Sequence, residues 1–292
     1  MTTSVLTADK SNFKSLVEKH QVTILVLLVY ALTWPLMILE VLASRGMLSF
    51  TPPAALLILQ GFMPGLAAVI VAGLVRGKPG IRALFRKVTI ARVGFKWYAF
   101  AFFAMAAVSI IAILITNRLG TSPAIPLLSP EMPFSGPLGV LAGTLMIFIF
   151  SMLFNTEEFA WRGIALPRLQ TRHNALVASL ILSIPWLFFH LPLVFKVGSS
   201  QSETSFLSYA IGMVATTILF TFLYNNTRGS LLPVWILHAS MNTWTQIFSI
   251  NSSAPNPLLD WTLTGVLVAF AIVVVAVYGA KSLSRANARI TE

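Results

Sequence analysis

Eight apolar stretches, each about 20 residues long, constrain the fold of this chain more than any other feature of its sequence. A helix of that length matches the thickness of the hydrocarbon layer of a bilayer. Only 10% of the 292 residues are charged, far fewer than the surface of a water-soluble domain carries. We therefore predict an all-α fold, a polytopic membrane bundle of about eight transmembrane helices. The predicted spans are 21–43, 53–75, 97–116, 138–160, 175–195, 206–224, 231–249 and 259–279.

The spans follow one another without a long linker or an internal repeat, which indicates a single helical domain over 21–280. Pro35, Pro64 and Pro185 fall inside the first, second and fifth stretches. Neighbouring helices of a bundle tolerate such residues, so we expect kinked helices rather than split ones. The first stretch is too long for the core of a typical signal peptide, and we keep it as a span.

Lys and Arg are distributed unevenly over the predicted loops. With a cytoplasmic N-terminus, 17 of the 20 basic residues lie in cytoplasmic segments, and only Arg45, Arg118 and Lys196 lie outside. Because basic residues are retained on the cytoplasmic side, the N-terminal segment 1–20 and the C-terminal tail 281–292 are both predicted to be cytoplasmic, in a protein of the cell membrane. The net charge of +11 then reflects topology and contact with anionic lipid head groups, so a nucleic-acid partner is not needed to explain it.

Two adjacent carboxylates, Glu157 and Glu158, lie at the end of the fourth stretch. Carboxylates at that depth are unfavourable unless another group compensates them. Arg162 follows Glu158 by four residues, so the two side chains share a helix face and can pair. Taken alone, this pair is typical of an ion pair at the membrane interface.

Two histidines on other stretches change that interpretation. His190 ends an apolar stretch, and His238 lies one helical turn before Asn242 on another. At a rise of 1.5 Å per residue, Glu157, His238 and His190 lie roughly 15, 13 and 20 Å from the cytoplasmic ends of their helices. A single histidine on an apolar helix is usually a packing residue, but three groups at a similar depth indicate a shared polar cavity. We expect this cavity to open to the cytoplasmic side through its basic rim.

These residues provide the groups needed to activate water. A glutamate can take a proton from water, while His and Asn donors stabilise the oxyanion that forms on a peptide carbonyl. Alternatively, two His and one Glu can bind Zn²⁺ and leave a coordination position open for water. Since the chain has no cysteine, a cysteine nucleophile and thiolate metal ligands are excluded. The residues themselves leave both mechanisms open.

With these residues, the sequence resembles the CPBP family (CAAX proteases and bacteriocin-processing enzymes), also called the abortive-infection or CAAX prenyl protease type 2 family. The family pattern is Glu-Glu-x-x-x-Arg, Phe-x-x-x-His and His-x-x-x-Asn on three transmembrane helices of a bundle of roughly eight. Here the three motifs are Glu157 and Glu158 with Arg162, Trp186 with His190, and His238 with Asn242. The resemblance covers about 150–245, and Trp186 replaces the usual Phe while keeping an aromatic ring at that position.

The resemblance implies an intramembrane endopeptidase whose core lies at about 138–250 and whose substrate is a membrane-associated peptide, of the prenylated type or not. It implies that Glu157 is the catalytic base, with His190 as its partner in holding the water. His238 and Asn242 are then oxyanion donors, or a further ligand and its support.

The same resemblance assigns Glu158, Arg162 and Trp186 a supporting role around the catalytic groups. Members are usually labelled metalloproteases, so Glu157, His190 and His238 are the expected ligands if Zn²⁺ is bound, and metal-free activation of water is the alternative.

Two other functions are compatible with these residues. A member of the same fold without catalytic activity would act as a membrane scaffold or regulator. A proton-coupled transporter would use the glutamate and histidines as a relay, although such proteins tend to have two matching halves, which are not found here. The sequence does not indicate the oligomeric state or the identity of the substrate.

Overall fold

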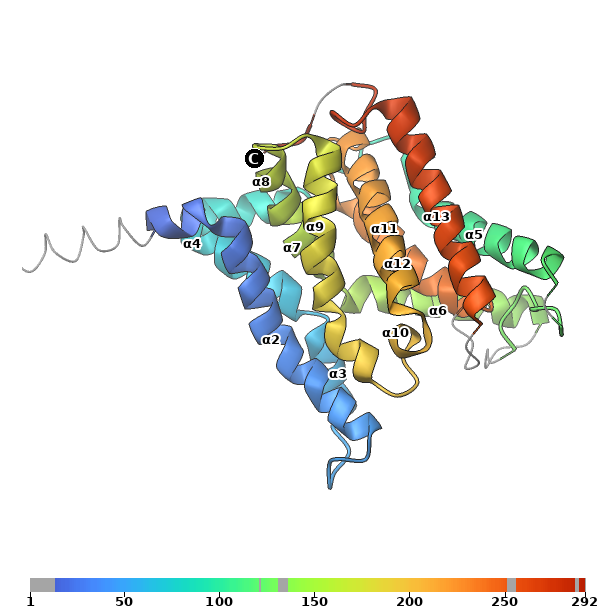
Figure 1. The fold of residues 1–292 in the computed structure, drawn as a ribbon. Helices are drawn as coiled ribbons and strands as arrows, with labels where there is room; N and C mark the ends of the chain where they lie inside the picture. The colour runs from blue at the N-terminus through green and yellow to red at the C-terminus, as the bar shows by residue number, and fades with distance from the viewer. Residues whose placement is uncertain (1–13, 121, 131–135, 251–255, 287–288, 292) are drawn as a thin grey trace, which may run out of the picture.

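The computed structural model describes residues 14–120, 122–130, 136–250, 256–286 and 289–291, and every regular element in these ranges is a helix (Figure 1). The longer helices are α2 (Gln21–Ser44), α4 (Met63–Arg86), α5 (Phe95–Arg118), α6 (Gly136–Phe154), α9 (Ala175–Phe189), α11 (Phe206–Asn226), α12 (Leu231–Ile247) and α13 (Pro257–Tyr278). The shorter ones are α3 (Ala54–Gln60), α7 (Glu157–Ala160), the π-helix η1 (Trp161–Ala165), α8 (Leu166–Gln170), the 3-10 helix η2 (Leu191–Phe195) and α10 (Ser200–Glu203). The predicted all-α membrane fold is confirmed.

All eight predicted stretches are helical, but they differ in length. Among the described residues, α2, α5, α6, α11 and α13 are long and apolar enough to cross a membrane. The pair α3 and α4, bent by 43°, passes the same test as a sixth span. With 15 and 17 residues, α9 and α12 are shorter than a full span, and both carry residues of the candidate site. Part of the candidate site therefore lies on helices that are shorter than a full span.

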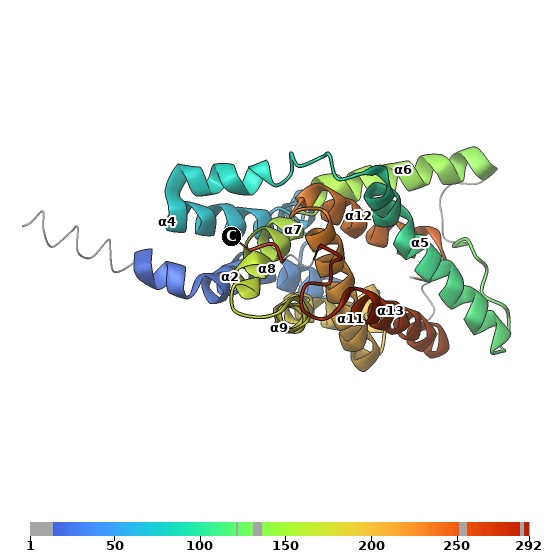
Figure 2. The ribbon, with the colours of Figure 1, turned by 90° about the horizontal axis from the view of Figure 1, so that it is seen from above.

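The fourth predicted stretch is not one helix. The structure ends α6 at Phe154 and starts α7 at Glu157, and α6 lies across the bundle whereas α8 and α9 run along it (Figures 1 and 2). Thr156 interrupts the helix, since its N–H and its hydroxyl both donate to the carbonyl of Gly61, at 3.0 and 2.7 Å. The same hydroxyl accepts from the N–H of Gly65 at 2.9 Å. This break puts Glu157 in the first turn of a new helix.

The second predicted stretch is also divided, which corrects the expectation that Pro64 lies inside a continuous helix. The chain turns between α3 and α4, and Pro64 falls in the first turn of α4, where its missing N–H has no intrahelical partner to lose. Gly61 is required at this corner, because a Cβ there would lie 1.7 Å from the carbonyl oxygen of Phe154. Pro35 and Pro185, in contrast, lie inside uninterrupted helices as expected.

The bundle has two ends that differ in charge. The first, which we call the basic end, is formed by 76–94, 162–174, 227–230 and 279–286, and the second, the distal end, by 45–53, 190–205 and 248–250. The carbonyl of Lys87 accepts from the N–H of Leu231 at 3.0 Å at the basic end. Arg45 Nε donates to the carbonyl of Phe195 at 2.8 Å at the distal end. In Figure 1, α8 and the C-terminus lie at one end of the molecule and α10 at the other.

The described part of the C-terminal segment packs onto the basic end. Asn225 Nδ2 donates to the carbonyl of Ser282 at 2.8 Å and to Gln170 Oε1 at 2.7 Å. The N–H of Ala175 donates to the carbonyl of Lys281 at 3.0 Å, and Leu283 is fully buried. This segment therefore closes the basic end of α9 and α11.

Candidate active site

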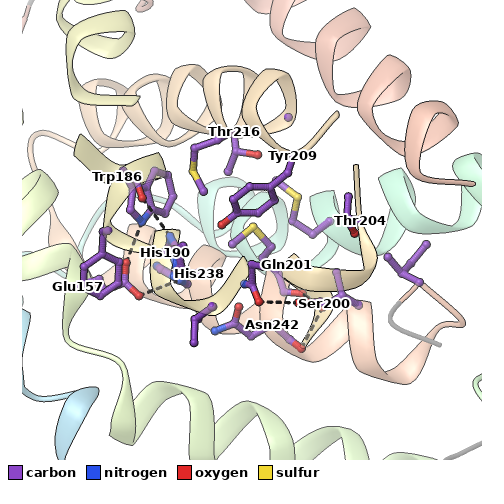
Figure 3. A pocket seen from close by; sticks show the side chains of 18 of the residues that line it. Glu157, Trp186, His190, Ser200, Gln201, Thr204, Tyr209, Thr216, His238 and Asn242 are labelled. Atoms are coloured by element: carbon purple, nitrogen blue, oxygen red, sulfur yellow. Dashed lines mark hydrogen bonds and ion pairs between the residues drawn. The ribbon is translucent and has the colours of Figure 1, made fainter. Parts of the chain in front are cut away.

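A cavity of about 420 Å³ occupies the distal half of the bundle. Its lining runs from Glu157 and His238 at the inner end to Ser200, Thr204 and Asp260 at the distal end. Figure 3 shows Glu157 and His238 on one side of it, with Ser200 and Thr204 on the other. Within the described ranges, no lining residue belongs to the basic end. The expectation that the cavity opens through a basic rim is therefore wrong.

Glu157 lies in the first turn of α7, where the helix dipole favours a carboxylate. One carboxylate oxygen, Oε2, accepts from the indole N–H of Trp186 at 2.8 Å and from that of Trp161 at 3.1 Å. The other, Oε1, lies 4.0 Å from His238 Nε2. Two rigid donors thus fix one carboxylate oxygen of Glu157, and the other carboxylate oxygen faces His238 and the cavity.

Glu158 points to a different side of α7, because adjacent residues of a helix are about 100° apart. Its oxygens lie 3.1 and 3.2 Å from Arg162 Nη1, and the two side chains are 1% and 0% exposed. The guanidinium carbon lies 4.2 Å from the ring centre of Trp186 and 4.5 Å from that of Phe220. The buried cation is therefore compensated by one carboxylate and two aromatic faces.

Hydrogen bonds on both ring nitrogens fix the tautomer of His238. Its Nδ1 lies 2.8 Å from Glu158 Oε1, a carboxylate that can only accept, so Nδ1 carries the proton. Its Nε2 lies 2.9 Å from Asn155 Nδ2, and this amide is oriented because Asn155 Oδ1 accepts from the N–H of Glu157 at 3.1 Å. Asn155 Nδ2 therefore donates to Nε2, which has no proton of its own. His238 in this state is an acceptor and not an oxyanion donor.

His190 has the same tautomer for a different reason. It caps the C-terminus of α9, and its Nδ1 lies 3.0 Å from the carbonyl of Trp186, which can only accept. Nδ1 is therefore the protonated nitrogen, and Nε2 keeps its lone pair. The ring lines the cavity, with the ring of Tyr209 at 6.2 Å between centres.

The amide of Asn242 and the hydroxyl-bearing ring of Tyr209 are further polar groups in the cavity (Figure 3). Asn242 lies one turn beyond His238 on α12, as its spacing predicted. The structure thus gathers the residues of all three motifs around one cavity or its supporting shell. In order along the chain, they are Glu157, Glu158, Arg162, Trp186, His190, His238 and Asn242.

Sequence reasoning missed three residues of this site. Asn155 was hidden because it lies in what looked like a continuous apolar helix, two residues before Glu157. Trp161 lies four residues after Glu157, a spacing that could have indicated the indole contact. For Tyr209 the sequence held no signal, since it is one aromatic residue in an apolar stretch.

The arrangement does not fit the three-ligand zinc site considered above. Within the described ranges, no three His, Asp or Glu side chains converge closely enough to hold a metal ion. Moreover, Asn155 donates to the His238 nitrogen that a metal would need. We therefore derive no step of the chemistry through a metal.

Comparisons with known proteins concern the region of the chain that holds this candidate site. Residues 137–244 match the family model described as type II CAAX prenyl endopeptidase, Rce1-like, and this range contains all three motifs. A protein of Methanococcus maripaludis named CAAX prenyl protease 2 is 26% identical over 165 residues, which are 54% of this chain and 59% of that protein. The chain thus spans about three fifths of the length of this curated relative. The motifs and these matches support the resemblance to the CPBP family, which covers an Rce1-like region at 137–244.

Proposed function

We propose that this protein is an intramembrane endopeptidase that hydrolyses a peptide bond with a water molecule activated by Glu157. The observation that carries the proposal is the position of Glu157 at the inner end of the cavity, with one oxygen fixed by two indoles and the other available. The family match and the protease named among its relatives support the same chemistry.

The reaction follows from the groups at the inner end. Glu157 Oε1 takes a proton from water as the water oxygen attacks the peptide carbonyl carbon, and the carbonyl oxygen becomes an oxyanion. The protonated Glu157 then gives its proton to the peptide nitrogen as the C–N bond breaks. The products are a carboxylic acid and an amine, and the glutamate is regenerated.

The remaining groups divide the tasks of holding the water and the oxyanion. His190 Nε2 is an acceptor, so it orients the water by taking a hydrogen bond from it. Asn242 and Tyr209 carry donors in the same cavity and are suited to the oxyanion. His238, whose Nε2 accepts from Asn155, holds the loop before α7 in place next to Glu157.

We propose that this chemistry proceeds without Zn²⁺, because the donor set described above does not converge on one point. The substrate is a membrane-associated peptide, and the apolar residues of the cavity, such as Met105, Met213 and Leu267, suit an extended apolar segment. Peptides with and without a prenyl-type lipid belong in the first substrate panel.

Cleavage of such a panel by the purified protein tests the proposal. Glu157→Gln preserves size and can still accept the two indole N–H groups, and it is expected to lower kcat by about 10²- to 10⁴-fold, the usual contribution of a general base. His190→Ala should also lower kcat. Glu18→Gln, on an exposed helical turn outside the cavity, is the matched control and should cleave at the wild-type rate.

The alternatives give different results in the same experiment. Equal cleavage by the wild type, Glu157→Gln and His190→Ala would end the proteolytic interpretation. A folded wild type that cleaves no peptide of the panel would favour a scaffold or regulator, and proton-coupled uptake by proteoliposomes would favour a transporter.

A further inference from the structure

We infer that substrate reaches Glu157 from the distal end of the bundle, and hence from the extracytoplasmic face of the membrane. That the molecule entering the cavity is a substrate rests on the proposed function, but the route by which it reaches Glu157 does not. Three independent features of the structure carry the inference: the direction of the cavity, the packing on its other side and the distribution of charge.

The cavity extends in one direction from the catalytic groups. On α11 it is lined by Ser208, Tyr209 and Thr216, which belong to the half of this helix nearest the distal end. On α13 the lining likewise begins at Asp260, in the first turn. The lining residue Ser200 begins α10 at the distal end, so the cavity reaches that end of the bundle.

The opposite direction is filled with side chains. Trp161, Arg162 and Phe220 are fully buried, and they pack against Glu157, Glu158 and Trp186 where the basic end begins. Beyond them, Lys87 Nζ donates to the carbonyl of the η1 residue at position 163 at 2.7 Å. A peptide from the basic end would have to displace this packed layer, whereas the distal route is already open.

Charge identifies which end faces the cytoplasm. Of the 20 Lys and Arg, 12 lie in the segments of the basic end and two, Arg45 and Lys196, in those of the distal end, and segments rich in basic residues are retained on the cytoplasmic side. The mouth of the cavity then faces outward. In the part of the chain that the structure describes, the lining includes no Lys or Arg, and its carboxylates are Glu157 and Asp260. An apolar peptide that is neutral or cationic therefore fits this route better than one that brings in a carboxylate.

Cysteine labelling tests the route directly, because the natural chain contains no cysteine and single-cysteine variants need no prior mutation. Thr216→Cys reports the interior of the cavity, Gln201→Cys its mouth and Arg172→Cys the basic end. A small, charged, membrane-impermeant thiosulfonate reagent is applied to intact cells or spheroplasts, and again after permeabilisation. Thermal unfolding of each variant shows that it is folded.

The expected result is labelling of Gln201→Cys and Thr216→Cys in intact cells, and labelling of Arg172→Cys only after permeabilisation. Labelling of Thr216→Cys only after permeabilisation, or in neither condition, would overturn the inference, as would external labelling of Arg172→Cys. Labelling does not require turnover, so it separates the two proposals: cleavage with cytoplasmic labelling would refute only the route, and external labelling without cleavage would refute only the enzyme.

A second measurement tests the charge preference. Two matched apolar peptides are compared, which carry either one Lys or one uncharged residue at the end that would lie in the mouth of the cavity. Asp260→Asn should raise KM for the lysine peptide by about two- to fivefold, as expected for the loss of a partly exposed ion pair, and leave its kcat unchanged. An equal change in KM for both peptides would show that Asp260 does not select charge.

Discussion

The ion pair of Arg162 and Glu158 offers a stability prediction that can be derived from its geometry. Arg162→Met keeps an apolar side chain against Trp186 and Phe220, but it leaves the Glu158 carboxylate, 1% exposed, without its cation. Removing one partner of a buried pair destabilises a protein by about 3–5 kcal/mol, because the other charge remains buried. At about 2–4 °C per kcal/mol for a chain of this size, Tm should fall on the order of 10 °C.

A second variant isolates the cause. In the double variant Glu158→Gln with Arg162→Met, neither member of the former ion pair carries a charge. The amide oxygen at position 158 can still accept from His238 Nδ1. We expect it to recover about half or more of the lost Tm, because replacing both members of a buried pair is often near neutral.

Unfolding can be followed by intrinsic fluorescence of the seven tryptophans in detergent, with Glu18→Gln as a control for surface charge. A double variant that is no more stable than Arg162→Met would refute the reasoning, because the loss would then come from packing and not from the stranded carboxylate.

Three further predictions concern the surroundings of the site. Asn155→Ala removes two hydrogen bonds next to Glu157, the proposed catalytic base, together about 2 kcal/mol, so kcat for peptide cleavage should fall roughly thirtyfold with little change in KM; a wild-type kcat would show that the contact to His238 is not needed. Treatment with a zinc chelator should leave the cleavage rate unchanged, and a loss of activity that added Zn²⁺ restores would contradict the proposed metal-free reaction. Asn225→Leu removes bonds to Gln170 and Ser282 and should destabilise the basic end by about 1–3 kcal/mol, measured as faster hydrogen exchange of the C-terminal segment; unchanged exchange would show that this segment is held by other contacts.

Local spacing was sufficient to predict several of the neighbouring residues in the candidate site. Four-residue separations placed Glu158 beside Arg162 and His238 beside Asn242, because side chains one turn apart share a helix face. The comparison of depths then indicated that three separate helices bring their polar groups together, and the 4.0 Å between His238 Nε2 and Glu157 Oε1 agrees with it. Both arguments use only the geometry of single helices and their ends.

The parts that failed depend on contacts between distant segments. Nothing in the apolar run before Glu157 indicates a break, because the helix is interrupted by hydrogen bonds from Thr156 to the corner at Gly61 and Gly65. The direction of the cavity was missed for a similar reason. A depth measured from the basic end locates a group along the helix axis, but it does not show on which side of that group the helices spread apart.

The two adjacent carboxylates explain how one short helix serves both structure and chemistry. Glu158 is neutralised by Arg162 and orients His238, so its charge is used within the protein. Glu157 receives only neutral donors, the indoles of Trp186 and Trp161, and therefore carries the negative charge that is left at the inner end of the cavity. In the proposed reaction, taking a proton from water moves this negative charge onto the oxyanion of the peptide carbonyl, for which Asn242 and Tyr209 carry donors in the same cavity. A substrate carboxylate in the cavity would be repelled by the negative charge of this site. The described lining of the distal route contains no Lys or Arg that could pair with such a carboxylate.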